Sequence, residues 1–160
     1  MKTWTQDEID SLVACQKQTI DAPKRTMRTE KGSHRNEATL QSLDEEHTFR
    51  VFFRQNAKFP ENFTVGLDYL PRQEPGSICL VRCNGPHGPH LLFPHHTHFH
   101  IHHARADALN EGRKSEVFAE ITTSYASYTE AIRYFGTYCH ITDWYLHFPA
   151  IEQLLFPDLP

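Results

Sequence analysis

The sequence lacks the features that mark secreted, membrane-spanning or strongly basic proteins. No apolar run approaches the ~20 residues that a transmembrane helix needs, and the N-terminal segment has no apolar signal-peptide core. Four cysteines are too few and too scattered for a disulfide scaffold, so we expect reduced thiols in a cytoplasmic protein without membrane contact. A formal net charge of −4 argues against a dedicated, non-specific nucleic-acid binder, so any nucleic acid must be bound by a local patch.

Charge is also missing from one internal stretch. No Asp, Glu, Lys or Arg occurs from Cys83 to Ala104, and eight of the twelve histidines lie in this stretch, in the run HGPHLLFPHHTHFHIHH. Imidazole exchanges protons near neutral pH and is the commonest metal ligand in proteins. Desolvating so many imidazoles has no packing advantage over aliphatic residues. The histidine run is therefore the candidate functional site.

The length of 160 residues, with 39% apolar and 22% charged residues, indicates one globular domain over 1–160. A capping box at Thr5 and Glu8 predicts a helix over 5–20, within an N-terminal segment 1–22. A second cap at Ser127 predicts a helix over 127–139, within 120–140. The last residues, 149–160, are expected to form a short docking tail.

Alternating apolar residues predict three strands, over 48–55, 63–70 and 77–83, in an antiparallel meander that spans 36–104. The basic, polar segment 24–38 is either a loop or two weak edge strands. We therefore expect the α+β class: a curved antiparallel sheet of four to six strands with an N-terminal and a C-terminal helix packed on it.

Residues 97–103, if extended, place His98, His100 and His102 on one face of a strand. Two functions fit this spacing. In one, an H-x-H pair binds zinc or iron together with a histidine of the preceding loop, His87, His90 or His95, which makes a metal-dependent hydrolase. The alternative metal ligands are His90, His98 and His100. In the other, two imidazoles act as general acid and general base on a phosphodiester, without a cofactor.

Arg82 favours the second function. Its guanidinium can bind a phosphate and would repel a nearby metal cation. In addition, the stretch from Cys83 to Ala104 has no carboxylate, which zinc or iron hydrolases usually use as a ligand or base. We expect Arg82 to hold the scissile phosphate, with an acid–base pair of His87 or His90 from a rigid turn and His98 or His100 from the strand. Arg50 and Arg54, which share a strand face, would guide an RNA or nucleotide substrate.

The signature R-x-N-G-x-H-G-x-H, followed by H-x-H-x-H, resembles that of small uncharacterised bacterial proteins of mobile elements and phage-related loci. It is more loosely similar to the TumE group of toxin–antitoxin toxins. That group carries Arg, then Asp or Asn, a pair of histidines and a Pro-His-His-x-His run, which correspond here to Arg82, Asn84, His87, His90, Pro94, His95, His96 and His98. The resemblance implies a toxin-like ribonuclease with a small antitoxin or regulator as partner. A homodimer is a further expectation.

Two other functions compete. Two-histidine phosphoesterases carry a pair of H-x-T motifs that converge on a phosphate, and this chain contains His95-His96-Thr97 and His140-Ile141-Thr142. A protein that only binds a nucleotide or a partner, without catalysis, would have the same sequence features.

Overall fold

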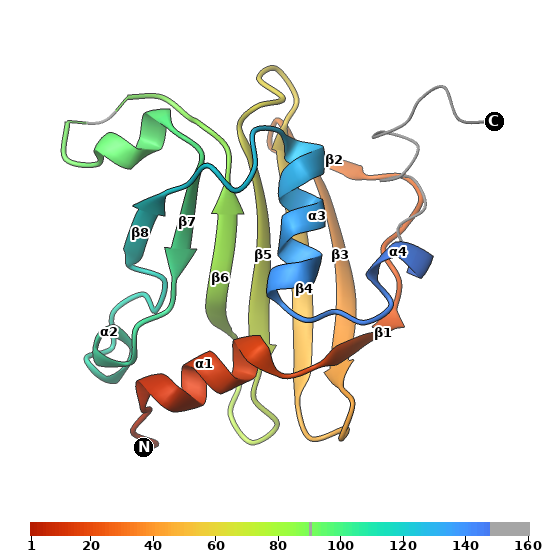
Figure 1. The fold of residues 1–160 in the computed structure, drawn as a ribbon, viewed down its shortest axis with the longest axis vertical. Coiled ribbons are helices and arrows are strands. Elements are labelled where there is room, and N and C mark those ends of the chain that lie inside the picture. Colours follow the sequence, from red (N-terminus) through yellow and green to blue (C-terminus); the bar gives the residue numbers. More distant parts are fainter. Residues whose placement is uncertain (90, 148–160) are drawn as a thin grey trace.

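The structure, a computed structural model, describes residues 1–89 and 91–147. It contains one eight-stranded antiparallel sheet in the order β1-β3-β4-β5-β6-β7-β8, with β2 paired to β3 (Figure 1). The strands are β1 (Lys17–Asp21), β2 (Arg28–Glu30), β3 (Ser33–Ser42), β4 (Thr48–Asn56), β5 (Phe63–Leu70), β6 (Ile78–Asn84), β7 (His100–His103) and β8 (Phe118–Ile121). The helices are α1 (Gln6–Ala14), α2 (Ala106–Asn110), α3 (Tyr128–Tyr138), α4 (Trp144–His147) and the 3₁₀ turn η1 (Pro94–Thr97).

The single α+β domain is confirmed, but the sheet has more strands than the four to six expected. The three predicted central strands are β4, β5 and β6, and the predicted C-terminal helix is α3. The additional strands include β2 and β3, which form from the polar segment 24–38 and its continuation. This segment gave no clear strand signal because the side chains at the start of β3, such as Arg35, are polar. The expected docking tail 149–160 lies outside the described residues.

The N-terminal helix is shorter than predicted. The capping box of Thr5 and Glu8 is present, but α1 ends at Ala14 rather than near residue 20, and residues 17–21 form β1. Lys17 is the physical reason. Its side chain is fully buried, and its ammonium donates to the carbonyl oxygens of Val13 and Cys15 at the end of α1, at 2.8 and 2.7 Å.

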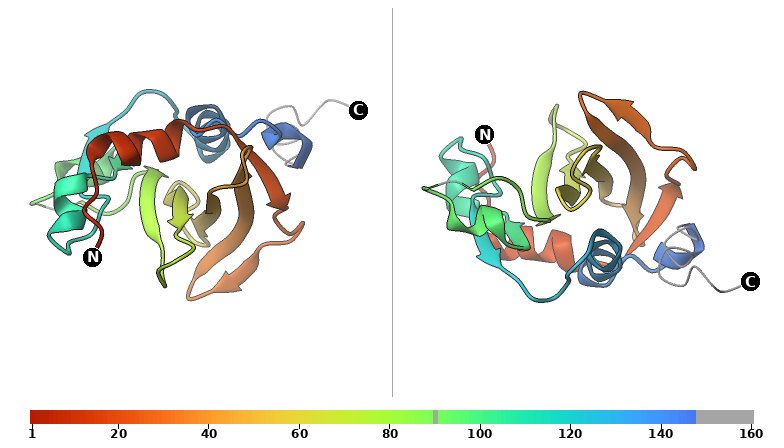
Figure 2. Two further views of the ribbon diagram at one scale, coloured as in Figure 1. Left: turned by 90° about the horizontal axis from the view of Figure 1, so that it is seen from below. Right: turned by 90° about the horizontal axis from the view of Figure 1, so that it is seen from above.

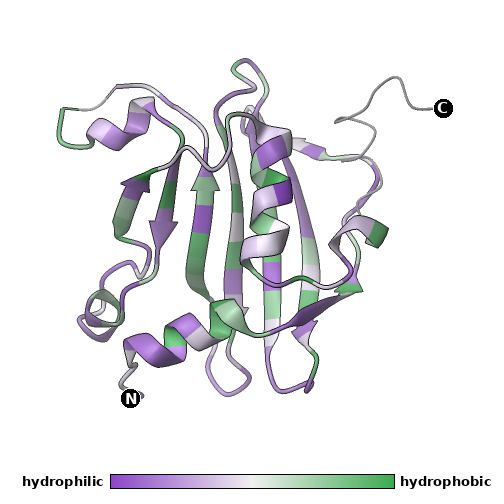
Figure 3. Cartoon of the chain, viewed as in Figure 1, coloured by the Kyte–Doolittle hydropathy of each residue, from purple (hydrophilic) through white to green (hydrophobic). Residues whose placement is uncertain are grey.

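Helices α1 and α3 lie on the same face of the sheet (Figure 2). The strands present their apolar side chains to these helices, and hydrophilic and hydrophobic residues alternate along them (Figure 3). The resulting core includes Leu40, Phe49, Val51, Val65, Leu67, Val81, Ile101 and Phe135.

We call the opposite side of the sheet the polar face. By the register of the strands, the residues on this face include Arg35, Glu37, Thr39, Arg50, Phe52, Arg54, Thr64, Gly66, Asp68, Arg82, Asn84, His100 and His102.

The predicted extended segment 97–103 is only partly a strand. Residues 94–97 form η1, and His98 follows it as the C-cap, so the strand starts at His100. Pro94 stands at the first turn of η1, where a fixed φ favours a helical turn and the missing N–H is not needed. His98 is therefore not a strand residue, and the side-chain alternation begins two residues later than expected.

Candidate metal centre

Strands β6 and β7 bring the histidine run to the polar face. In their antiparallel register, Arg82 lies opposite His102 and Asn84 lies opposite His100. Directly opposed residues project to the same side of a sheet, so these four side chains share the polar face. His100 is fully buried there, and His102 is partly buried.

The loop between β6 and β7 folds back over these residues. The backbone N–H of His87 donates to the carbonyl oxygen of His96 at 2.7 Å, which closes the loop on itself. The rings of His87 and His95 then lie against the ring of His100, with centroids 5.2 and 4.9 Å away. Among the described residues, five imidazoles thus gather at this end of the polar face: His87, His95, His96, His100 and His102.

Three members of this cluster have the geometry of a metal site. His95, His100 and His102 each offer one ring nitrogen, and these three atoms lie within 4.8 Å of one another. We call these residues the histidine trio. The ring nitrogen Nδ1 of His100 bonds the carbonyl oxygen of His98 at 2.7 Å, and Nδ1 of His102 bonds that of Glu116 at 3.1 Å. A carbonyl cannot donate, so Nδ1 carries the proton in both rings, and Nε2 keeps its lone pair.

The remaining contacts of the trio are weak or absent. Among the described residues, Nε2 of His100 accepts one long bond, 3.2 Å, from the side-chain amide of Asn84. Nε2 of His95 is buried and has no hydrogen-bond partner among the described residues. Buried polar atoms are usually satisfied, so an unpartnered imidazole nitrogen beside two others indicates a place for a ligand.

Burial lowers the pKa of four of these imidazoles and so favours their neutral form. It lowers the pKa of His100 to about 4 and that of His102 to about 3; for His102 the charge of Arg82 adds to the effect. Burial also lowers the pKa values of His87 and His95. Neutral imidazole is the form that coordinates a metal ion.

Arg82 borders the trio, as the sequence predicts for a phosphate-holding residue. One terminal nitrogen of its guanidinium lies 3.9 Å from a carboxylate oxygen of Glu116. Its Nε is buried without a hydrogen-bond partner among the described residues. Glu116 therefore touches both parts of the site, since its backbone orients His102 and its carboxylate offsets the charge of Arg82. Sequence reasoning did not find Glu116, because it follows the histidine run by more than ten residues.

The two arginines expected to guide a polyanion differ. Arg50 is engaged in an ion pair with Asp68 at 2.6 Å, and the Asp68 side chain is 9% exposed. Arg54 bonds two neutral groups instead, the side chains of Asn62 and Thr64, at 2.9 and 3.3 Å. Arg54 is thus the better candidate for contact with an anion.

The predicted ligand set of His90, His98 and His100 shares only His100 with the histidine trio. His98 is exposed, and its Nδ1 is 3.1 Å from the hydroxyl of Thr97. It contributes its backbone carbonyl to the site rather than its ring. His90 lies outside the described residues. His95 was one of three loop candidates, and only the fold of η1 distinguishes it from the others.

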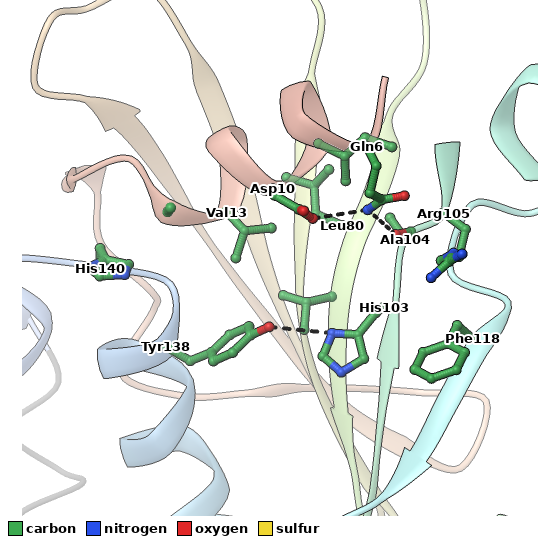
Figure 4. A pocket seen from close by; sticks show the side chains of 13 residues that line it. Gln6, Asp10, Val13, Leu80, His103, Ala104, Arg105, Phe118, Tyr138 and His140 are labelled. Carbon is green, nitrogen blue, oxygen red and sulfur yellow. Dashed lines mark hydrogen bonds between the residues drawn. The ribbon is translucent and has the colours of Figure 1, made fainter. Parts of the chain in front are cut away.

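The two H-x-T motifs do not share a site. His140 lines a separate cavity of about 470 Å³ between α1, α3 and β7, on the face opposite the trio (Figure 4). His103 also points into this cavity, where its ring is 3.4 Å from the hydroxyl of Tyr138. The second motif therefore cannot meet His95 on a common phosphate.

Comparison of the chain with protein families, curated proteins and solved structures gave no match. Within the described ranges 1–89 and 91–147, no helix is both long and apolar enough to cross a membrane. The resemblance to the bacterial toxin group stays a hypothesis, and the functional assignment rests on the geometry of the site.

Proposed function

We propose that the histidine trio binds a divalent metal ion, zinc or iron(II), and that the protein is a metal-dependent phosphodiester hydrolase. The observation that carries this proposal is the convergence of three imidazole nitrogens within 4.8 Å from His95, His100 and His102. Three neutral imidazoles are a known ligand set for catalytic zinc, with the fourth position left for water.

Bonds outside the trio support the same function. Histidines that ligate metals usually donate their second ring N–H to a carbonyl or carboxylate, which fixes the ring and its tautomer. Both strand histidines, His100 and His102, have such a bond, each to a backbone carbonyl. A bound ion would take the lone pair of His100 that now accepts the long bond from Asn84.

Arg82 gives the site its substrate preference. A metal ion lowers the pKa of bound water and so supplies a nucleophile near neutral pH. A guanidinium beside it binds two oxygens of a phosphate and stabilises the charge that develops during attack. The cation and Arg82 repel each other, but the carboxylate of Glu116 offsets this repulsion because it lies 3.9 Å from Arg82. The substrate class is therefore a phosphodiester, in RNA or a nucleotide.

A second candidate is metal-independent cleavage of the same bond by an acid–base pair. The observation that favours it is the contact between His87 and His100, whose ring centroids are 5.2 Å apart, on the polar face that also holds Arg82. One of the two rings must then be protonated while the other is not. The lowered pKa values of both rings disfavour this state, so we rank it below the metal centre.

Metal content and hydrolysis test the proposal together. Purified protein is analysed for bound metals and assayed on bis(p-nitrophenyl) phosphate and on RNA, with and without EDTA. We expect one zinc or iron per chain and activity that EDTA removes and added metal restores. His95→Ala and His102→Ala should lose the metal and ~10²-fold or more of the activity. His98→Ala is the matched control, because it removes a ring of the same segment that is not in the trio.

If the protein holds no stoichiometric metal and stays active in EDTA, the metal-dependent mechanism is refuted and the acid–base mechanism is supported. Equal loss of metal in His98→Ala and His102→Ala would contradict the assigned trio.

The resemblance to toxins adds a cellular readout. Expression of the wild-type chain should arrest bacterial growth, and His102→Ala should relieve the arrest.

A further inference from the structure

Unsatisfied polar atoms concentrate on the polar face. Among the described residues, five buried side-chain nitrogen or oxygen atoms have no hydrogen-bond partner. Four of them belong to the histidine site or to the polar face beside it: Nε of Arg35, Nε of Arg82, Oδ1 of Asn84 and Nε2 of His95. Such atoms are rare in folded proteins, and their clustering indicates a ligand larger than a single metal ion.

Three of these four residues lie in rows that cross the strands: Arg35 and Asn84 share one row, and Arg82 lies in the next. The register pairs Arg35 with Arg54, Arg54 with Thr64, Thr64 with Asn84, and Asn84 with His100. One continuous row thus runs from β3 to the histidine trio. Adjacent strands lie ~4.8 Å apart, so the row is about 19 Å long. This length exceeds a mononucleotide and suits several nucleotides of a chain.

The far end of the row carries positive charge. No ion pair involves Arg35 or Arg54 among the residues that the structure describes. Burial lowers the pKa of the Arg54 guanidinium, and the charges of Arg35 and Arg82 lower it further. Three guanidinium groups thus repel one another, and an anion between them would relieve this repulsion. Arg50 is not part of this set because Asp68 neutralises it.

An aromatic ring lies next to the arginines. Phe52 is half-buried and lies two residues before Arg54 on the same face of β4. A second row of the polar face, next to the one that contains Arg54, places Phe52 between Glu37 of β3 and Gly66 of β5. Its ring fills the space that a side chain at position 66 would occupy. Arg54 lies beside this ring in β4, and Glu37 is directly opposite it in β3. An aromatic ring next to an arginine on an open sheet face can stack an unpaired base.

We infer that the polar face binds single-stranded RNA across the strands, from Arg35 and Arg54 on β3 and β4 toward the histidine trio. This inference rests on the proposed function, since the trio would cleave the chain that the arginines hold. Arg35 and Arg54 contact phosphates, Phe52 stacks a base, and Arg82 holds the phosphate at the metal.

Asn84 makes RNA the better fit than DNA. Without a metal ion its amide nitrogen donates to His100, so its Oδ1 is a buried acceptor that has no donor among the described residues. The phosphates and sugar ring of DNA offer only acceptors, whereas the 2′-hydroxyl of RNA can also donate. A ribose beside Asn84 would satisfy this atom.

Binding is measured in EDTA, so that it is independent of metal and cleavage. Fluorescence anisotropy follows labelled oligouridine of four and twelve nucleotides, oligothymidine of twelve, and a twelve-base-pair RNA duplex. We expect the long single-stranded RNA to bind at least tenfold more tightly than each of the others. Arg35→Gln and Arg54→Gln should each weaken binding about tenfold and reduce the slope of log affinity against log salt by about 0.7. Phe52→Leu should weaken binding about tenfold.

Arg113→Gln is the matched control, because this exposed arginine pairs with Glu111 away from the polar face. Unchanged affinity in Arg35→Gln, Arg54→Gln and Phe52→Leu, or equal affinity for RNA, DNA and duplex, would overturn the inference. Metal-dependent hydrolysis of the small diester without RNA binding would refute the RNA surface and leave the proposed function intact. RNA binding that the polar-face variants weaken, in a protein that holds no metal and cleaves nothing, would support the RNA surface and refute the hydrolase.

Discussion

The ammonium of Lys17 donates a hydrogen bond of 2.9 Å to the carbonyl oxygen of Cys139, although the two residues are 122 positions apart. Together with its bonds to Val13 and Cys15, this contact joins the end of α1 to the end of α3. The two helices that cover the core are thus fixed to β1 through one side chain.

Replacement of this lysine should therefore destabilise the fold. Lys17→Met keeps the length of the side chain but leaves three carbonyl oxygens without their donor. We expect a loss of about 3 kcal/mol in the free energy of unfolding, measured by urea denaturation. Lys58→Met, at an exposed loop position, is the control and should change stability by less than about 0.5 kcal/mol. Equal stability of the two variants would contradict the role of Lys17.

Tyr125 connects the core to the histidine site. Its hydroxyl is 3.0 Å from the carbonyl oxygen of Asn84 and 2.8 Å from that of His100. Tyr125→Phe should reduce stability by about 1–2 kcal/mol, because the two buried carbonyls share the one hydroxyl proton that the substitution removes. It should also weaken metal binding, since His100 is a member of the trio. Tyr145→Phe is the control, because this residue is 42% exposed, and it should change neither the stability nor the metal affinity. Calorimetry would measure both quantities.

The close approach of Phe52 to Gly66 predicts a coupled pair. Gly66→Ala places a methyl group where the ring of Phe52 lies, and we expect a loss of about 1–3 kcal/mol in urea denaturation. In a Phe52→Ala background the same substitution should cost much less, because the ring has gone. Additive losses in the double variant would mean that the strain at position 66 has another source.

Metal should stabilise the folded chain if the trio binds it. A ligand at 100 times its dissociation constant adds about 2.7 kcal/mol, which for a domain of this size raises the melting temperature by about 5–10 °C. We expect this shift with zinc in the wild type and in His98→Ala, and its loss in His100→Ala. A scan by differential scanning calorimetry, with and without EDTA, would measure it. A shift that persists in His100→Ala would place the ion elsewhere.

The sequence predicted the central strands better than the register of the histidine run. Because His98, His100 and His102 all alternate, periodicity alone cannot show where the strand begins. The start of the strand depends on Pro94, which begins a helical turn over residues 94–97. These residues are therefore not available to extend the strand toward the N-terminus. The result is an H-x-H pair at 100 and 102 rather than at 98 and 100.

Tertiary contacts account for the other differences. A lysine at position 17 fits an exposed helix face from sequence, and only the carbonyls that converge on its ammonium explain its burial. Likewise, the ion pair of Arg50 with Asp68 depends on the register of β4 and β5, which the sequence does not specify. The polar side chains of β3, including Arg35, similarly gave no sign that this strand lies inside the sheet.

The trio spans only residues 95–102, whereas the arginine row needs strands from residue 33 onward to be paired. Closing a loop of a few residues loses little chain entropy, so the three imidazoles can meet before the sheet is complete. A metal bound to the trio would then link η1 to β7 early, and the slower long-range pairing of the strands would follow. The spacing therefore predicts that the histidine trio assembles before the row of residues that runs from Arg35 across the sheet.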